Sequence, residues 1–571
     1  MNTRSLTFWL LLTTAPSMAQ GQTNFTKITT GDIVNDGGAS VSVAWGDYDN
    51  DGYVDLFVSN DSLGGGARNF LYHNNRNGTF TRINSGPITT DVGDFRGAAW
   101  VDYDNDGKLD LSVVSEATKN FLYRNNGDGT FMRETNIISS DTIRNSIGGS
   151  WADYDRDGFV DFFVANADLG NNLLYHNNGD NTFTKITSGP IVNDVGHSLS
   201  CAWADYDNDG FPELFVSNFL GPTNSLYDLI SYDRFPGEFQ RVTNAGSIVT
   251  SPANSIGCAW GDYDNDGFLD LFVANDGILN NEGSPCFLFR NNGDRTFSKI
   301  TGIGLEEGPT RSPSCAWGDY DNDGYLDLLV LNNNNHNFLY HNEGDGTFTR
   351  VTTGAVVNDG GPGYNSSGCS WVDYDNDGFL DLFIANGAGP SGPGPHQVNN
   401  FLYHNEGNSN AWIKIKCIGA VSNRSAIGAK VRVTTRIRGK MVRQLREVTM
   451  GDGFQSGSPL ETHFGLGDAT NIDLVRVEWP SGIVQDFQNL SVKQFLILTE
   501  PSRLAVSVTN GAPQLSLQGG RAMRYDLQSS TDLQTWLVLG NITITNLNGT
   551  VLFADTNATS LSRRFYRAEL R

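Results

Sequence analysis

The sequence predicts an all-β protein organised around a seven-bladed β-propeller. Its 65 glycines and only 18% charged residues favour many short strands joined by tight turns. A fixed internal period is the second observation, because periods of this length indicate repeat architectures. The motif W-x-D-Y-D-x-D-G recurs at intervals of 51 to 57 residues and begins at Trp45, Trp100, Trp151, Trp203, Trp260, Trp317 and Trp371.

Each repeat holds four strand-like segments. In the first repeat, a strand precedes Trp45 and is followed by Leu56-Phe57-Val58, Phe70-Leu71-Tyr72 and Thr79–Ile83. Asn-Gly and Asp-Gly turns between the last two segments tolerate the positive φ of tight hairpins, so consecutive strands should pair antiparallel. The seventh repeat ends at 401–405 without a fourth strand, and Phe25–Thr29 matches the missing copy. We therefore predict one ring over residues 24–408, closed by its N-terminal strand.

The N-terminus has the pattern of a cleaved signal peptide over residues 1–20. Arg4 precedes the apolar run Leu6–Leu12, and Ser17-Met18-Ala19 places small residues before the expected cleavage point. The alternative is a membrane anchor, but the run is about half of the ~20 residues that a spanning helix needs. We expect an exported protein: secreted, periplasmic or displayed on the cell surface.

Four of the six cysteines stand two residues before a repeated Trp, at Cys201, Cys258, Cys315 and Cys369. Equivalent inner-strand positions of neighbouring blades should lie beyond the ~7 Å Cα separation that a disulfide spans, so buried free thiols are expected. Cys286 and Cys417 are left unassigned.

Seven acidic loops of the form D-x-D-x-D-G-x-x-[DE] follow the repeated Trp residues. Carboxylates at positions 1, 3, 5 and 9, a carbonyl at position 7 and Gly at position 6 match the spacing by which calcium loops wrap an ion, and oxygen ligands favour Ca²⁺. The predicted ligands of up to seven Ca²⁺ ions are Asp47, Asp49, Asp51, Tyr53, Asp55; Asp102, Asp104, Asp106, Lys108, Asp110; Asp153, Asp155, Asp157, Phe159, Asp161; Asp205, Asp207, Asp209, Phe211, Glu213; Asp262, Asp264, Asp266, Phe268, Asp270; Asp319, Asp321, Asp323, Tyr325, Asp327; and Asp373, Asp375, Asp377, Phe379, Asp381.

Two other interpretations of these loops are weighed against calcium. An EF-hand would need Glu at position 12, where the repeats have Val or Ile in strand-like sequence. Solvated turns are the second, but the loops hold 28 of the 64 carboxylates, and the remaining 36 face 39 Lys and Arg. Nearly the whole net charge of −25 therefore lies in clusters that would repel themselves without counterions.

The motif W-x-D-Y-D-N-D-G-x-x-D-L-F-V resembles the FG-GAP/VCBS repeats of the integrin α-subunit head and of exported bacterial proteins. The resemblance covers roughly residues 24–408. It implies a propeller whose loops bind Ca²⁺ between the first two strands of each blade.

Two further features of the repeats are considered for function. His73, His176, His341 and His404 share one repeat position with Arg124 and Arg290, so we expect periodic, solvated strand residues there and no catalysis or zinc. Insertions between the second and third strands, at 219–237, 276–285 and 387–395, should lie on one face, with Tyr232, Arg234 and Phe235 as plausible ligand contacts.

Two β-rich segments follow the repeats. Residues 411–499 resemble the ASPIC/UnbV domain through Asn423–Ala429, Gly451–Phe454, His463–Gly467 and Val477–Gly482. Their excess of Lys and Arg could contact the acidic propeller or an anionic glycan, and ordinary surface charge is the interpretation we favour. Residues 502–571 alternate apolar and polar positions and look like a small Ig- or fibronectin-like sandwich.

These features favour a non-enzymatic binding or adhesion module for a glycan or protein ligand. The alternative is a polysaccharide-active, lyase-like enzyme that uses a propeller calcium ion, and the fourth repeat, with Pro212 and Glu213, is its place to look. A quinone-dependent dehydrogenase is a weaker option, because its propellers lack such loops. No nucleotide-binding motif is present, and the negative charge opposes nucleic-acid binding.

Overall fold

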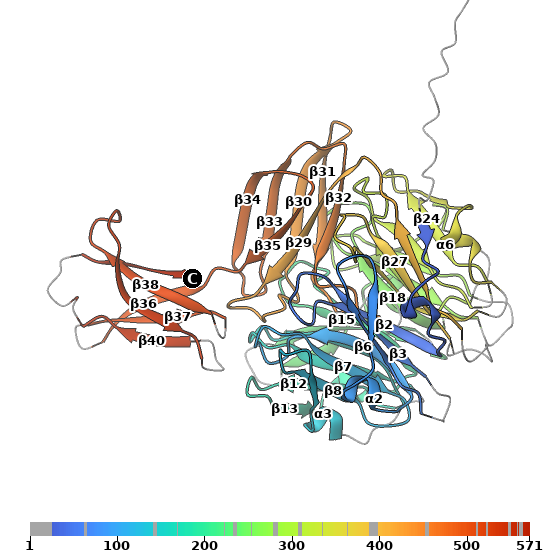
Figure 1. Cartoon of the computed structure of the whole chain (residues 1–571), viewed down its shortest axis with the longest axis horizontal. Helices are drawn as coiled ribbons and strands as arrows, with labels where there is room; N and C mark the ends of the chain where they lie inside the picture. The colour runs from blue at the N-terminus through green and yellow to red at the C-terminus, as the bar shows by residue number, and fades with distance from the viewer. Residues whose placement is uncertain are drawn as a thin grey trace, which may run out of the picture.

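The fold is seen in a computed structural model (Figure 1). It describes residues 25–570 except 62–65, 141–144, 168–169, 222, 232–236, 253, 278–283, 306–310, 334, 362–363, 388–397, 451–455, 510–511, 521–522, 546–549, 557 and 559–562. The predicted signal peptide, the contacts Tyr232, Arg234 and Phe235, and the motif Gly451–Phe454 lie outside the described residues. No helix in the described ranges is long and apolar enough to cross a membrane.

Seven four-stranded antiparallel sheets, here called blades one to seven, make up the described part of the repeats. The innermost strands are β2 (Ser40–Gly46), β6 (Phe95–Val101), β10 (Ser146–Ala152), β14 (Ser198–Ala204), β18 (Ser255–Gly261), β22 (Cys315–Gly318) and β26 (Ser366–Val372). Each packs against the next, and β26 packs against β2, so the blades form a closed ring. The predicted all-β class and four-stranded antiparallel blades are confirmed.

The second strand of every blade begins at the acidic residue of loop position 9. These strands are β3 (Asp55–Asn60), β7 (Asp110–Ser115), β11 (Asp161–Asn166), β15 (Glu213–Asn218), β19 (Asp270–Asn275), β23 (Asp327–Val330) and β27 (Asp381–Asn386). The third strands are β4 (Phe70–Asn74), β8 (Phe121–Asn125), β12 (Leu173–Asn177), β16 (Ser225–Ser231), β20 (Phe287–Asn291), β24 (Phe338–Asn342) and β28 (Phe401–Asn405).

The outermost strands complete the blades, and the N-terminal strand supplies the last of them. These strands are β5 (Phe80–Ile83), β9 (Phe131–Arg133), β13 (Phe183–Ile186), β17 (Glu238–Arg241), β21 (Phe297–Ile300), β25 (Phe348–Arg350) and β1 (Phe25–Lys27). Because β1 pairs with β28, with Phe25 opposite Asn405, the predicted ring closure is confirmed. Single-turn helices lead from outermost strands toward the next blade: α1 (Asp32–Asn35), α2 (Pro87–Thr90), α3 (Ile137–Ser140), α4 (Pro190–Asn193), α5 (Ser247–Thr250) and α6 (Ala355–Asn358).

The repeated Trp and the Tyr of loop position 2 join neighbouring blades. Trp100 stacks on Tyr48 of the preceding blade at 5.7 Å between ring centroids, and its indole N–H donates to the carbonyl of Ala44. The same stacking joins Tyr154 to Trp203 and Tyr320 to Trp371. The motif W-x-D-Y therefore builds the apolar contact between blades as well as the start of each acidic loop.

The cysteines of the inner strands are buried thiols outside any disulfide of the described residues, as predicted for Cys201, Cys258, Cys315 and Cys369. Cys417 is likewise a buried thiol, while Cys286 is partly exposed, and neither forms a disulfide within the described residues. One expected insertion is wrong: residues 225–231 form the third strand β16, so 219–237 is not a single connection between the second and third strands of blade four. The other two insertions connect second and third strands as expected.

The segment after the ring folds as two sheets around one apolar core. Its strands are β29 (Ala411–Ile418), β30 (Lys430–Ile437), β31 (Lys440–Glu447), β32 (Thr462–Gly467), β33 (Ile472–Glu478), β34 (Val484–Leu490) and β35 (Gln494–Thr499). The sheet orders are β32-β29-β35, with β29 and β35 parallel, and β31-β30-β33-β34. We call this unit the cap, because it lies against one face of the ring (Figure 1).

The last segment forms two three-stranded sheets, β36-β37-β40 and β39-β38-β41. Its strands are β36 (Arg503–Thr509), β37 (Ala512–Gln518), β38 (Arg524–Ser530), β39 (Leu537–Thr543), β40 (Thr550–Ala554) and β41 (Phe565–Leu570). Figure 1 shows this red unit projecting away from the ring. Its core includes Ala420 of the cap, which ties the two units together.

Candidate metal centres

The seven acidic loops curl in the same way because two positions adopt a left-handed backbone. Position 4, which is Asn in six loops and Arg156 in the third, has φ between 57° and 62°. The position-6 glycines have φ between 87° and 99°, which favours glycine because it lacks a Cβ. These two reversals fold the loop back so that its alternate carboxylates face one another.

Backbone amides orient the carboxylates within each loop. In blade one, the amides of Asp51 and Gly52 donate to the two carboxylate oxygens of Asp47, at 2.8 and 3.1 Å. The amide of Asn74, on the third strand, donates to Asp55 Oδ1 at 2.8 Å. Ligand atoms of Asp47, Asp49 and Asp55 consequently lie within 4.8 Å of one another. Among the described residues, no contact shows whether the carbonyl oxygens of position 7 face the carboxylate clusters. These carbonyls therefore remain predicted ligands.

The clustering makes ionisation of the buried carboxyl groups unfavourable. Burial, followed by the neighbouring Asp charges, raises the pKa of Asp55 to about 9 and those of Asp102 and Asp262 to about 8. Burial likewise raises the pKa of Asp381 well above its usual value. A divalent cation at the centre of each cluster would remove this penalty.

Several carboxylate oxygens have no hydrogen-bond partner among the described residues. Asp110 Oδ2, Asp153 Oδ1 and Asp373 Oδ1 are buried in this way. Buried oxygens of this kind are costly unless a cation or a donor satisfies them. The donor set, which is carboxylate oxygen from four residues of a loop, therefore fits a hard cation such as Ca²⁺.

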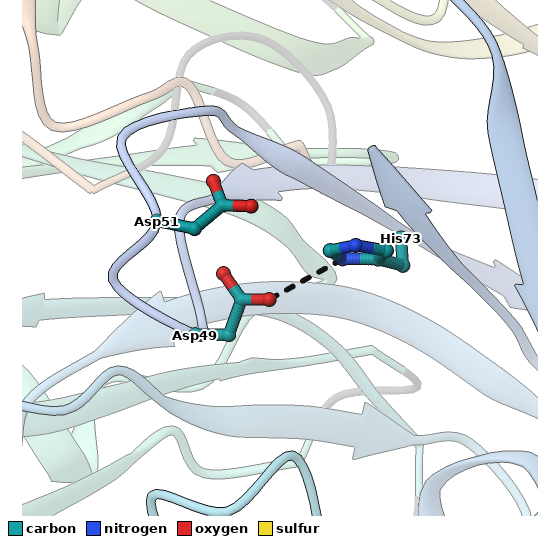
Figure 2. Close-up of side chains that lie close together, drawn as sticks. All are labelled: Asp49, Asp51 and His73. Atoms are coloured by element: carbon teal, nitrogen blue, oxygen red, sulfur yellow. Dashed lines mark ion pairs between the residues drawn. The ribbon is translucent and has the colours of Figure 1, made fainter. Parts of the chain in front are cut away.

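The histidines of the third strands contact the clusters, so the prediction that they are solvated is wrong. His73 Nδ1 lies 3.2 Å from Asp55 Oδ1 and 3.4 Å from Asp49 Oδ2, and Figure 2 shows the ring directed at Asp49. His176 is only 6% exposed and lies 3.0 Å from Asp161 Oδ1. The pairing with Asp381 and Asp375 raises the pKa of His404 to about 9 despite burial.

Arginine fills the same position in two other blades and makes the same kind of contact. Arg124 pairs with Asp104 at 2.6 Å, and Arg290 pairs with Asp264 at 2.6 Å and with Asp266 at 2.9 Å. In these blades, the third-strand position occupied by His or Arg therefore supplies a basic side chain that contacts the carboxylate cluster. The periodicity of the histidines and arginines along the sequence was the signal for this role.

Blade four departs from the repeat but keeps its geometry. Glu213 begins β15 opposite Ala204, the register of position 9 in the other blades, and the amide of Tyr206 donates to it at 3.2 Å. The third strand has Asp228 where other blades have His or Arg, and Arg295 of blade five pairs with Asp207 at 2.8 Å instead. Glu213 thus belongs to a loop cluster of the common kind.

The cap covers the face that carries the acidic loops. Cationic side chains of the cap approach the position-1 aspartates of six loops. The closest pairs are Lys414 with Asp373 at 2.8 Å and Lys430 with Asp205 at 2.5 Å. Lys416 lies 3.6 Å from Asp47, Arg424 acts electrostatically on Asp102, and Arg446 acts on both Asp262 and Asp319. The expectation that the positive charge of this segment is ordinary surface charge is therefore wrong.

Backbone contacts also hold the cap on the ring. The amide of Gly457 donates to the carbonyl of Val43, and the hydroxyl of Ser150 donates to the carbonyl of Met450. A cavity of about 140 Å³ remains between cap and ring, lined by Trp260, Trp317, Trp371, Arg446, Glu447 and His463 among others. The charged side chains that line this cavity already take part in the contact between the cap and the ring.

Comparison with known proteins agrees with this architecture. The protein-family model described as FG-GAP-like repeat matches residues 55–113, 102–164, 153–216, 262–330 and 319–384. The family model described as ASPIC and UnbV matches residues 419–505. The molecule is thus a propeller of acidic-loop repeats joined to a second β-rich domain. It belongs to the FG-GAP-repeat proteins that carry an ASPIC/UnbV domain.

Among curated proteins, the chain is similar to cartilage acidic protein 1. It is 25% identical to the Homo sapiens protein over 328 residues, which are 56% of this chain and 39% of that protein. It is 26% identical to the Xenopus tropicalis protein over 330 residues, covering 56% and 40%. The chain thus spans about two fifths of the length of these relatives.

Among solved structures, the chain resembles BBS1N, solved in complex with ARL6DN and soaked with lead, at 11% identity and a TM-score of 0.40. That match covers 68% of this chain and 99% of the other.

Proposed function

We propose that this protein is an exported, calcium-stabilised propeller that acts as a non-enzymatic binding or adhesion module for a glycan or protein ligand. The observation that carries the calcium assignment is the convergence of ligand atoms to within 4.8 Å in the loops of blades one, three, six and seven, together with the buried, unsatisfied oxygens of Asp110, Asp153 and Asp373. Export rests on the sequence of residues 1–20.

Calcium is proposed over zinc because oxygen ligands dominate each loop. Four carboxylates and one carbonyl suit the six to eight oxygen ligands of Ca²⁺, whereas the single histidine near some clusters already pairs with Asp at position 9. The ion would hold each loop in its curled form and so support the Trp–Tyr contacts between blades.

The face opposite the cap is the proposed recognition surface. The cap covers the loop face, while connections between second and third strands reach the other side of each blade. Variable connections on one face of a repeat scaffold are a usual place for ligand contacts.

Calorimetry of the full mature chain tests the calcium assignment. Each site with free calcium about one hundredfold above its Kd should add about 2.7 kcal/mol to the unfolding free energy, so excess EDTA should lower the Tm by well over ~10 °C. A Tm that is the same in calcium and in EDTA would refute the proposal. A glycan array probed in calcium and in EDTA then tests the class of ligand.

A further inference from the structure

The third-blade loop differs from the other six in the charges around it. Its first aspartate, Asp153, is 4% exposed and accepts the amide of Gly158 through Oδ2 at 3.1 Å. Oδ1 of the same carboxylate is buried and has no hydrogen-bond partner in the part of the chain that the structure describes. The charges of Asp157, Asp161 and Asp155 act on it most strongly after burial, so it faces the cluster.

Among the described residues, no Lys or Arg forms an ion pair with any of the four acids of this loop. Only His176 approaches them, with Nδ1 at 3.0 Å from Asp161 and 3.5 Å from Asp155. All other loops have a Lys or Arg from the cap near position 1, as described above. The third loop therefore keeps the least compensated group of four carboxylates.

Arg156 explains why the cap supplies no cation here. It replaces the Asn that stands at position 4 in the other loops, and its Nε donates to the carbonyl of Pro480 in the cap at 2.5 Å. Its guanidinium lies over the ring of Phe211 in the next blade, 4.8 Å from the centroid. The cap thus contacts blade three through a neutral carbonyl, and the one cation of the loop turns away from its own carboxylates.

Among the described residues, the second-blade loop has the most Lys and Arg side chains close to its four carboxylates. Lys108 Nζ lies 2.6 Å from Asp106 Oδ2, and Arg124 lies 2.6 Å from Asp104 Oδ2. Arg424 of the cap acts electrostatically on Asp102. Three cations of the protein therefore offset four carboxylates, and little negative charge remains to attract an ion.

We infer that the seven loops are not equivalent and that the third-blade loop is the tightest calcium site of the protein, while the second-blade loop is the weakest. This inference rests on the proposed calcium function. The physical cause is that a nearby fixed cation repels Ca²⁺ and competes for the same carboxylate oxygens. We expect the two sites to differ in Kd by at least about tenfold, since such charges are only partly screened in a buried cluster.

Calcium titration of two matched variants tests this ranking. Calcium-stripped full chain is titrated by calorimetry, and native mass spectrometry counts the ions bound at limiting calcium. As calcium is added to the wild-type chain, one ion should bind before the others, in a separate tight phase. The D155N/D161N variant should lose this first tight phase, and the D104N/D110N variant should keep it.

The outcomes separate the ranking from the proposal beneath it. A tight phase that survives in D155N/D161N, or disappears in D104N/D110N, would overturn the ranking while calcium binding stands. A wild-type chain that binds no calcium would overturn the proposed function itself. Circular dichroism in saturating calcium controls for folding of each variant.

A third variant keeps the inference testable if removal of acids prevents folding. K108Q/R124Q leaves every carboxylate of the second-blade loop in place and removes two of its competing cations. We expect its weakest phase to tighten by about tenfold or more. An unchanged titration would show that these cations do not set the affinity.

Discussion

Buried carboxylates occur in two regions of this molecule, and their surroundings differ. In the loops, the carboxylates face other carboxylates, and burial raises the pKa of Asp55 to about 9. In the cap, Glu500 is 2% exposed but accepts three backbone amides, from Ala420, Val421 and Ser422, at 2.7 to 2.9 Å. Hydroxyls of Ser422 and Ser481 also donate to it.

This contrast teaches that burial alone does not make a carboxylate dependent on a metal. Glu500 has donors for both of its oxygens, so the protein itself replaces the lost water. The loops have fewer donors for four crowded acids, so under the proposed function a Ca²⁺ ion from solution would supply the missing positive charge. The cap should therefore be stable without calcium, and the ring should not.

The largest expected effect comes from removing the satisfied carboxylate. Glu500→Ala leaves three amides, two of them fully buried, without an acceptor, so the unfolding free energy of the cap should fall by about 4 kcal/mol. The loss should be equal in calcium and in EDTA, measured by chemical denaturation. Glu569→Ala, at an exposed position, serves as the control. A loss that appears only in calcium would erase the distinction between the two regions.

A loop carboxylate should show the opposite dependence on calcium. Asp381→Asn removes a predicted ligand in blade seven and should cost about 2 kcal/mol in saturating calcium. In EDTA the same change removes one of several crowded acids, so the stability should stay the same or rise. Thermal melts in calcium and in EDTA measure this difference, and Glu406→Gln at an exposed position is the control. Equal losses in both conditions would contradict the metal role of Asp381.

The smallest expected effect is the change in stability per titrating group and per pH unit. Asp55 and Asp102 have pKa values of about 9 and about 8 in the folded protein, against about 3.9 when unfolded. The folded state therefore binds more protons than the unfolded state between these values, and stability falls as pH rises. The raised pKa of His404, about 9, acts in the same direction, because its charged form is favoured by folding.

For the calcium-free chain, each such group should cost about 1.4 kcal/mol per pH unit within that window. The Tm in EDTA should fall steadily from about pH 5 to about pH 8, whereas the Tm in saturating calcium should change little. Calorimetry across this range makes the comparison. A calcium-free Tm that rises with pH would show that the loop acids are not crowded as described.

Much of the fold could be predicted from local patterns. The W-x-D-Y-D-x-D-G repeat gave the blades, and Phe25–Thr29 was recognisable as the missing strand because its pattern matches the other outermost strands. The acidic loops could be located because their acids recur at fixed alternate positions around a glycine at position 6, which the structure holds at positive φ. The error at 225–231 arose because the third strand of blade four has Asp228 where other blades have His or Arg, and no Asn-Gly or Asp-Gly turn follows it in the sequence.

The histidines and the cap show what the sequence could not give. The periodicity of His73 and His176 was visible, but whether that position faces solvent or the loop depends on how the third strand crosses position 9. The excess of Lys and Arg after residue 411 was visible too, but not its target.

The sequence by itself determined the repeated blades, the ring closure and the seven loops, because these depend on spacing along the chain and on local backbone preferences. Only the tertiary structure decided which charges meet. Lys430 and Asp205 are 225 residues apart in the chain and lie 2.5 Å apart in the folded protein. Electrostatic energy depends on distance in space, so the loops that look alike in sequence are placed in different fields by the cap and by Arg156.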